Sequence, residues 1–141
     1  MADSTHRAVT LTRLDEGVYL ATNARGATVR FGSKADDAFS PVELLLAALA
    51  GCSAVDVDVV TGRRSPAETF EVRSEAEAVR DETGNILNDL TLTFRVTFPE
   101  GEAGDAARAA LPRAVAASHE RTCTVSRTIE AGRPVAVVIE P

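Results

Sequence analysis

Residues 40–60, SPVELLLAALAGCSAVDVDVV, decide the fold because they join a helix start signal to an apolar run too long for an ordinary strand. Ser40 at the N-cap, Pro41 in the first turn and Glu43 three residues after the cap predict a capping box. The run ends at Gly62, a natural helix C-cap. Apolar side chains cover nearly the whole circumference, which predicts a helix buried inside a wrapping sheet or across a subunit interface.

The segment before this helix has the pattern of short strands. Between Ala8 and Phe31, runs rich in valine, leucine and threonine are interrupted at residues 15–17 and 23–26, where Asp-Glu-Gly and Asn-Ala-Arg-Gly occur. Such breaks are typical of turns between antiparallel strands. The N-terminal region is therefore predicted to be a meander of two or three strands.

The segment after the helix contains both strands and helices. Residues 70–79 and 90–98 alternate apolar and polar side chains on either side of a turn at 81–85, which predicts a half-buried hairpin. The remaining expected elements are an alanine-rich helix over 103–118 that Pro112 kinks or splits, a short helix over 122–129 and a closing strand over 134–140. This order predicts an α+β fold with mostly antiparallel pairing, and residues 1–141 are expected to form a single domain.

Composition limits the partners of the protein. The 141 residues carry a net charge of −6, with one tyrosine, five phenylalanines and no tryptophan. We expect no nucleic-acid partner, because a basic stripe for phosphates is missing and stacking aromatics are few. No uncharged apolar run of membrane-spanning length occurs, and the start MADSTHRAVT lacks the apolar segment of a signal peptide. A cytoplasmic protein without a membrane partner is expected.

The chain has two cysteines, Cys52 in the apolar helix and Cys123 in the sequence Thr-Cys-Thr-Val-Ser-Arg. In a reducing cytoplasm they are expected to be free or transiently paired rather than a structural disulfide. Taken alone, Cys52 can be explained by packing, because free cysteine is among the most buried residue types. The polar neighbours of Cys123 predict a partly accessible thiol, the setting in which reactive cysteines occur.

Two motifs give the chain a resemblance to a known family. Ser40–Cys52 closely resembles the central-helix motif of the OsmC/Ohr family, which comprises osmotically inducible protein C and the organic hydroperoxide resistance proteins. His119–Thr128 resembles the family's second cysteine motif, with Thr124 in place of a common proline. The patterns Ser-Pro-x-Glu and Gly-Cys-Ser-Ala-x-Asp resemble a less characterised branch. The resemblance implies an OsmC-like fold, with antiparallel sheets around a buried central helix in an intertwined homodimer.

The resemblance also implies an activity. In the peroxidase members of the family, the first cysteine attacks an organic hydroperoxide and becomes a sulfenic acid. The second cysteine condenses with it to a disulfide, which a dithiol reductant reopens. Cys52 would then be the peroxidatic residue and Cys123 the resolving one, with no cofactor and no metal.

A reactive thiol needs a cation that lowers its pKa, and the resemblance implies an arginine from the N-terminal strands paired with a glutamate at the helix start. Arg30 is the first candidate and Arg25 the second, and a solvated strand-edge charge is the alternative for both. Glu43 is the candidate glutamate, one position later than in the hydroperoxide-resistance branch. On a straight helix it lies ~13.5 Å from Cys52 along the axis and about 180° around it, so a cap explains Glu43 without catalysis.

Asp56 lies one helical turn after Cys52 on the same face. A carboxylate beside a thiol favours the neutral form of that thiol through repulsion between like charges. We therefore expect Asp56 to face solvent, or to pair with an arginine where the helix emerges.

Two other functions stay open at this point. Cys52, His119 and Cys123 supply three possible ligands for an open zinc site, although the chain has no CxxC or HExxH spacing. Alternatively, an apolar pocket at the dimer interface binds a small hydrophobic ligand without catalysis, and Cys52 is merely packed there.

Overall fold

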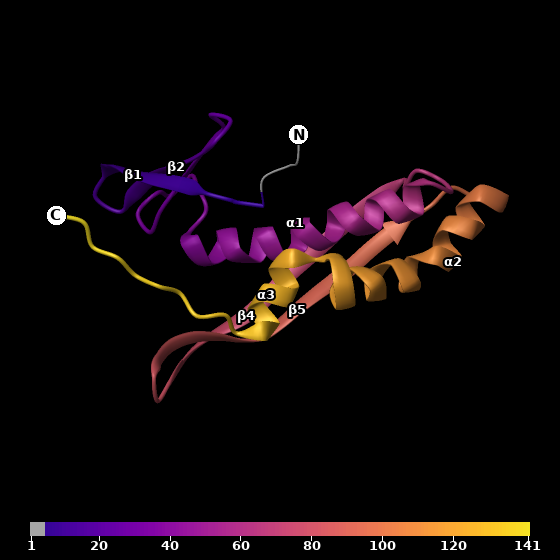
Figure 1. Ribbon diagram of the computed structural model, residues 1–141. Coiled ribbons are helices and arrows are strands. Elements are labelled where there is room, and N and C mark those ends of the chain that lie inside the picture. The colour runs from indigo at the N-terminus through magenta and orange to yellow at the C-terminus, as the bar shows by residue number, and fades with distance from the viewer. Residues whose placement is uncertain (1–4) are drawn as a thin grey trace. The chain divides into compact units, whose positions relative to one another are not determined.

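The computed structural model describes residues 5–141, which form antiparallel strands and helices (Figure 1). The chain divides into two compact units, Met1–Leu45 and Leu46–Pro141. The boundary falls inside one helix, and the single-domain prediction stays a prediction. The elements are β1 (Val9–Asp15), β2 (Val18–Asn23), β3 (Thr28–Phe31), α1 (Pro41–Gly62), β4 (Thr69–Asp81), β5 (Gly84–Thr97), α2 (Glu102–Ala117), the π-helical turn η1 (Ser118–Thr122) and α3 (Thr124–Ala131).

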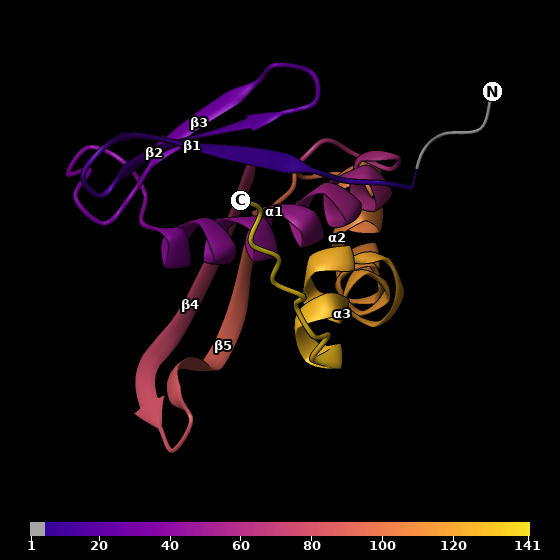
Figure 2. The same ribbon diagram turned by 60° about the vertical axis from the view of Figure 1, so that its left-hand side comes forward.

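The first unit contains the predicted meander of three strands, in the order β1-β2-β3 (Figure 2). Both pairings are antiparallel, with Leu11 opposite Ala21 and Ala21 opposite Val29. Gly17 and Gly26 take positive φ angles of 67° and 89° in the two turns, a conformation that glycine adopts without a steric penalty. The prediction of strands broken at these two turns is confirmed.

Helix α1 begins with the predicted capping box. The backbone N–H of Glu43 donates to Ser40 Oγ at 3.2 Å, and the backbone N–H of Ser40 donates to Glu43 Oε1 at 2.9 Å. The first of these bonds satisfies one of the N–H groups that a helix end leaves unpaired, and the second fixes the cap residue itself. The helix then continues for 22 residues to Gly62, as the apolar run predicts.

Only one stripe of α1 is buried within the single chain. Val55 and Val59 are 65% and 53% exposed. Burial of the whole circumference is therefore not reached within one chain, and the predicted subunit interface stays a prediction. The buried stripe consists of residues four positions apart, which are Leu49, Ser53, Val57 and Thr61.

Helix α1 also has the length of a membrane span. By length and composition alone it is long and apolar enough to cross a membrane, a test that core helices of soluble proteins pass as well. The expectation that the protein has no membrane partner stays a prediction.

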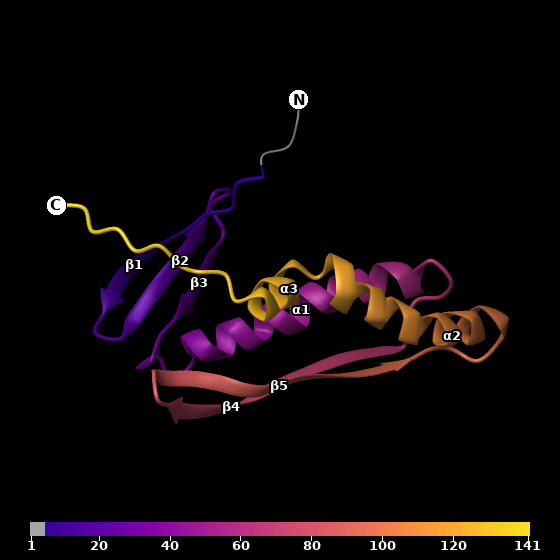
Figure 3. The ribbon, with the colours of Figure 1, turned by 60° about the horizontal axis from the view of Figure 1, so that its bottom comes forward.

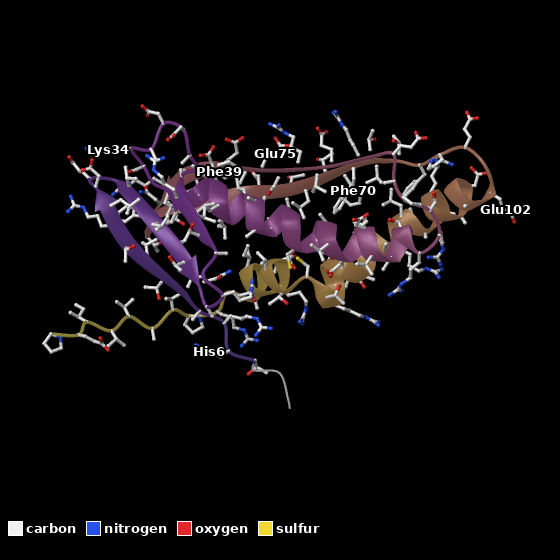
Figure 4. All side chains as sticks on the ribbon, turned by 90° about the horizontal axis from the view of Figure 1, so that it is seen from above. His6, Lys34, Phe39, Phe70, Glu75 and Glu102 are labelled. Carbon is white, nitrogen blue, oxygen red and sulfur yellow. The ribbon has the colours of Figure 1, made fainter. Side chains whose placement is uncertain are left out.

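The second unit contains the predicted hairpin, a long antiparallel pair of β4 and β5. The hairpin runs along α1 (Figure 3), and Phe94 of β5 lines a cavity together with Leu49 of α1. Half-buried and exposed side chains alternate along both strands, as predicted. Accordingly, Phe70 lies on the half-buried face of β4, whereas Glu75 is exposed and projects away from the helices (Figure 4).

Helices α2 and α3 lie beside α1 in the second unit (Figures 1 and 3). Helix α2 is continuous through Pro112, so the helix is not split there, whereas the alternative of a kink stays a prediction, and the irregular turn η1 follows at its C-terminal end. Gly104 allows α2 to start close to the preceding backbone, since a Cβ there would lie 1.7 Å from the carbonyl oxygen of Pro99. The predicted short helix is confirmed as α3.

The closing strand predicted over residues 134–140 is wrong. This segment leaves α3 as an extended trace (Figure 1), and none of the strands described over residues 5–141 pairs with it. Val135 and Ile139 are 86% and 91% exposed. A strand needs the backbone hydrogen bonds of a neighbour, so the alternating valines alone do not produce one.

Candidate active site

The second unit brings Cys52 and Cys123 together, although 71 positions separate them in the sequence. Cys52 lies in α1 and is half-buried, whereas Cys123 lies between η1 and α3 and is completely buried. Both are free thiols. The predicted accessibility of Cys123 is wrong, because its polar neighbours Thr122 and Ser126 direct their hydroxyl groups to other residues of the protein.

The surroundings of Cys123 hold it in the neutral form. Burial raises the pKa of the Cys123 thiol, whereas the backbone N–H of Ser126, which points at the sulfur, lowers it. Hydrogen bonding to Cys52, and the negative charges of a Cys52 thiolate and of Asp56, raise the pKa of Cys123 further. The net effect is a raised pKa, so Cys123 is a thiol at neutral pH and can donate a hydrogen bond to Cys52.

The sequence led us to expect that Asp56 faces solvent or pairs with an arginine, and the structure shows neither arrangement. It is half-buried, and its Oδ2 atom accepts hydrogen bonds from Ser118 Oγ and Thr122 Oγ1, both at 2.8 Å. Ser118 and Thr122 are the first and last residues of η1. The predicted repulsion between Asp56 and a thiol is present, and the thiol whose pKa it raises is Cys123.

Three hydroxyl residues of this site were missed by the sequence reasoning. Besides Ser118 and Thr122, Ser53 contributes a hydroxyl whose oxygen lies 3.2 Å from Ser118 Oγ, and this pair is buried. The sequence contained one usable signal, because Ser53 and Thr61 interrupt the stripe of α1 that is otherwise apolar. A polar side chain on a buried stripe requires a hydrogen-bond partner.

The candidate activating residues lie in the first unit, where Arg30 and Glu43 have other partners. Arg30 Nη1 lies 2.7 Å from Asp37 Oδ1, and this pair lowers the pKa of Asp37. Hydrogen bonds from Ser40 to the Glu43 carboxylate lower the pKa of Glu43, and the backbone N–H of Ser40 has a larger effect than its hydroxyl group. Arg25 is exposed in a turn. A role of Arg30, Arg25 or Glu43 toward Cys52 stays a prediction.

The second unit contains a cavity of about 500 Å³, which neither cysteine lines. Its walls come from α1, β5, α2, η1 and α3, and they include Ser53, the residue after Cys52. Leu49, Leu92 and Phe94 make its interior apolar, whereas its polar side includes His119. Such a combination of apolar walls and a few polar groups is typical of sites for small organic molecules.

His119 is occupied by partners other than the cysteines. Its Nε2 atom lies 3.2 Å from Glu130 Oε1, and its Nδ1 atom lies 3.3 Å from Ser126 Oγ. Among the side chains described over residues 5–141, no group of three His, Cys, Asp or Glu is arranged to hold a metal ion. The zinc site of Cys52, His119 and Cys123 therefore has no support from the geometry.

Known proteins resemble this chain in sequence. A family model described as OsmC-like protein matches residues 33–138, which include both cysteines. Protein YhfA of Escherichia coli K12 is 33% identical over 114 residues, which make up 79% of this chain and 81% of YhfA.

Solved structures share the fold. A hypothetical protein from Aquifex aeolicus superposes with a TM-score of 0.72 at 21% identity, over 91% of this chain and 89% of that one. The organic hydroperoxide resistance protein OhrB of Bacillus subtilis gives 0.50 at 19% identity, over 87% of this chain and 90% of its own. The match of the family model across the helix of Cys52 and the segment of Cys123, together with the similarity to YhfA, shows that this chain belongs to the OsmC-like protein family.

Proposed function

We propose that this protein is a cytoplasmic thiol peroxidase that reduces organic hydroperoxides with Cys52 and Cys123. The observation that carries the proposal is the meeting of the only two thiols of the chain, with Cys123 as a neutral thiol beside Cys52. The OsmC-like family includes peroxide-reducing proteins, and the name of OhrB refers to organic hydroperoxide resistance. A half-buried thiol beside a second cysteine is the arrangement that reversible thiol oxidation requires.

The reaction has two steps in this chain. The Cys52 thiolate attacks the outer oxygen of the hydroperoxide, the O–O bond breaks, and the alkoxide leaves as an alcohol after taking a proton. Cys52 is now a sulfenic acid. The Cys123 sulfur then attacks the Cys52 sulfur, an S–S bond forms, and the S–O bond breaks to release water with the proton of Cys123. A dithiol reductant of unknown identity supplies the two electrons that reopen the disulfide.

The environments of the two thiols favour this division of labour. Only a thiolate is a good nucleophile, and the raised pKa of Cys123 keeps that residue protonated. Cys123 is also completely buried, whereas Cys52 is half-buried. Cys52 is therefore the better placed of the two to meet a hydroperoxide first.

The proposal includes an activating arginine, for which Arg30 is the first candidate and Arg25 the second. Arg30 would have to exchange its exposed partner Asp37 for the thiolate, and exposed ion pairs are weak enough to exchange. Glu43 is the candidate partner of that arginine, but its two hydrogen bonds to Ser40 support the role of a helix cap. Its part in catalysis is the less favoured one.

The proposal also includes a homodimer. Val55 and Val59 lie one turn apart on α1 and are more than half exposed, and the tail adds Val135 and Ile139. Contiguous exposed apolar side chains on a soluble chain mark interaction surfaces. A second copy of the same chain would cover them.

A thiol titration tests the peroxidase function. The reduced protein should lose both thiols on addition of one equivalent of cumene hydroperoxide and should form an intramolecular disulfide. Cys123→Ser should instead retain one oxidised sulfur as a sulfenic acid, detectable by mass and by dimedone labelling. Cys52→Ser should not react. Unchanged thiols in the wild type would refute the activity, and full reactivity of Cys52→Ser would refute the assignment of roles.

The cavity in the second unit supports a second candidate function, the binding of a small hydrophobic ligand without catalysis. Its apolar residues include Leu49, Leu92 and Phe94. A fluorescent apolar probe such as anilinonaphthalene sulfonate should bind there, and Leu92→Glu should abolish the binding. If the probe binds and the wild type consumes no hydroperoxide, the ligand-binding function is the correct one.

A further inference from the structure

The turn that precedes Cys123 is attached to α1 through hydrogen bonds to Asp56 and Ser53. Ser118 Oγ and Thr122 Oγ1, at the two ends of η1, both donate to Asp56 Oδ2 at 2.8 Å. Cys123 follows immediately, and its backbone N–H donates to the carbonyl oxygen of Ser118 at 2.8 Å. The position of the Cys123 backbone therefore depends directly on the turn that Asp56 holds.

Counting protons gives the direction of the next hydrogen bond. Ser118 has one hydroxyl proton, which it donates to Asp56, so in the contact of 3.2 Å with Ser53 it must be the acceptor. The chain runs from Ser53 through Ser118 to Asp56. Ser53 and Ser118 are 3% and 1% exposed. Removing the acceptor at its end would leave one buried hydroxyl proton without an acceptor, which is costly.

The anchor and the peroxidatic thiol belong to the same stretch of helix. Asp56 is four residues after Cys52, so both side chains lie on one face of α1. The resolving thiol is attached to that face through η1, and π-helical turns of this kind are rare and occur frequently at functional sites. One face of α1 thus positions both sulfurs of the proposed reaction.

We propose that Asp56 is a positioning residue, which holds the turn Ser118–Thr122 against α1 so that the Cys123 sulfur is placed to attack Cys52. The inference deepens the proposed function and rests on it. We assign Asp56 no part in the first step. It acts in the second step, in which the Cys123 sulfur must approach Cys52 along the axis of the S–O bond that breaks.

The test compares Asp56→Ala with Asp56→Asn. Both hydroxyl groups donate to the same oxygen, so the single amide oxygen of asparagine can accept both bonds while the charge is lost. Asp58→Ala is the matched control, because it removes the same charge from an exposed position on the same helix. Rapid-mixing mass spectrometry after addition of cumene hydroperoxide separates formation of the Cys52 sulfenic acid from formation of the disulfide.

Asp56→Ala should form the sulfenic acid at least as fast as the wild type but should close the disulfide about 10- to 100-fold more slowly, because a displacement of about 1 Å has an effect of this size. Asp56→Asn should restore most of the rate, and Asp58→Ala should not change it. Equal disulfide rates in Asp56→Ala and the wild type would overturn the proposal. So would an Asp56→Asn variant as slow as Asp56→Ala, because the charge rather than the hydrogen bonds would then matter.

A second assay reads the same geometry without a hydroperoxide. The disulfide reagent dithiobis(nitrobenzoate) converts Cys52 to a mixed disulfide and releases one thionitrobenzoate. Cys123 then attacks the Cys52 sulfur, forms the Cys52–Cys123 disulfide and releases a second one. Asp56→Ala should slow only the second release, and unchanged release would overturn the proposal. A wild type that is inert to cumene hydroperoxide but gives a fast second release would refute the peroxidase and leave the positioning role intact.

Variants of the donors keep the proposal testable if Asp56→Ala does not fold. Thr122→Val and Ser118→Ala each remove one of the two hydrogen bonds to Asp56. Each should slow the second release, less than the loss of both bonds would. If neither variant slows it while circular dichroism shows native helix content, the turn is not held in this way and the proposal is wrong.

Discussion

The buried thiol of Cys123 makes the stability of the protein depend on pH in one direction. Its pKa in the folded chain is raised, first of all by burial, above the ordinary value of 9.0. The folded state therefore holds this proton more tightly than the unfolded state does. The resulting contribution to stability is complete below the ordinary pKa and is lost as the pH rises through the raised one.

We expect the free energy of unfolding of the reduced wild type to fall with rising pH in this alkaline window more steeply than that of Cys123→Ser. Urea unfolding in the presence of a phosphine reductant, repeated from neutral pH to alkaline pH, measures the difference. Titrating groups that do not interact with Cys123 are common to both proteins and cancel. Parallel curves would show that Cys123 exchanges its proton as freely in the folded chain as in the unfolded one.

Arg30 permits a second prediction for a single residue. If it supplies the cation for Cys52, Arg30→Met should raise the pKa of that thiol and reduce the thiolate fraction about tenfold for each pKa unit. The rate of sulfenic acid formation with cumene hydroperoxide should fall accordingly. Asp37→Ala is the control, since it removes the present partner of Arg30 and retains the guanidinium. If Arg30→Met reacts as fast as the wild type, Arg30 is a surface charge only and Arg25 becomes the next variant to measure.

At the scale of helices and strands, local patterns predicted what depends on local interactions. The capping residues Ser40 and Glu43 predicted the start of α1, and the alternation after Phe70 predicted the hairpin. The failures depend on partners that the pattern does not contain. Pro112 did not split α2, because packing of the helix can outweigh the loss of one backbone hydrogen bond. The alternating tail is not a strand, because nothing in the described chain pairs with it.

The candidate site was predictable in the same uneven way. The two cysteines stood out because they are the only ones, and each lies in a recognisable motif. The hydrogen bonds that position them could not be recognised in the sequence, because they join Ser53 and Asp56 of one segment to Ser118, more than 60 positions away. The polarity of the segment around Cys123 pointed to solvent, whereas the structure shows Cys123 buried and the hydroxyl groups of Thr122 and Ser126 bonded to other residues of the protein.

The capping box offers a prediction at the scale of the helix. Ser40→Ala should lower the free energy of unfolding by about 1 kcal/mol, the usual effect of losing a serine N-cap. Glu43→Gln should retain the reciprocal hydrogen bond, because an amide oxygen can accept from the backbone N–H of Ser40. Chemical denaturation measures both. A Glu43→Gln protein of near-native stability that nevertheless reacts much more slowly with cumene hydroperoxide would contradict the cap as the main role of Glu43.

At the scale of the whole molecule, the single chain leaves apolar surface uncovered. The exposed side chains belong to α1, which is apolar nearly all round, and to the C-terminal tail. A helix of this composition is stable in water when both sides are covered. The second unit covers the stripe that includes Leu49 and Val57, and the opposite side, with Val55 and Val59, requires another partner, for which we propose a second copy of the chain.

Val55→Asp should therefore convert the dimer to monomers. Covering one valine is worth about 1.5–3 kcal/mol, and in a two-fold symmetric interface each substitution counts twice. The two new carboxylates would add repulsion if the valines of the two copies meet near the symmetry axis. Thr93→Glu is the control, because it adds a charge to the exposed face of β5 without removing apolar surface.

Sedimentation velocity should show wild type and Thr93→Glu as dimers and Val55→Asp as a monomer. A wild type that sediments as a monomer at all concentrations would refute the homodimer, and the exposed valines of α1 would then require a different partner.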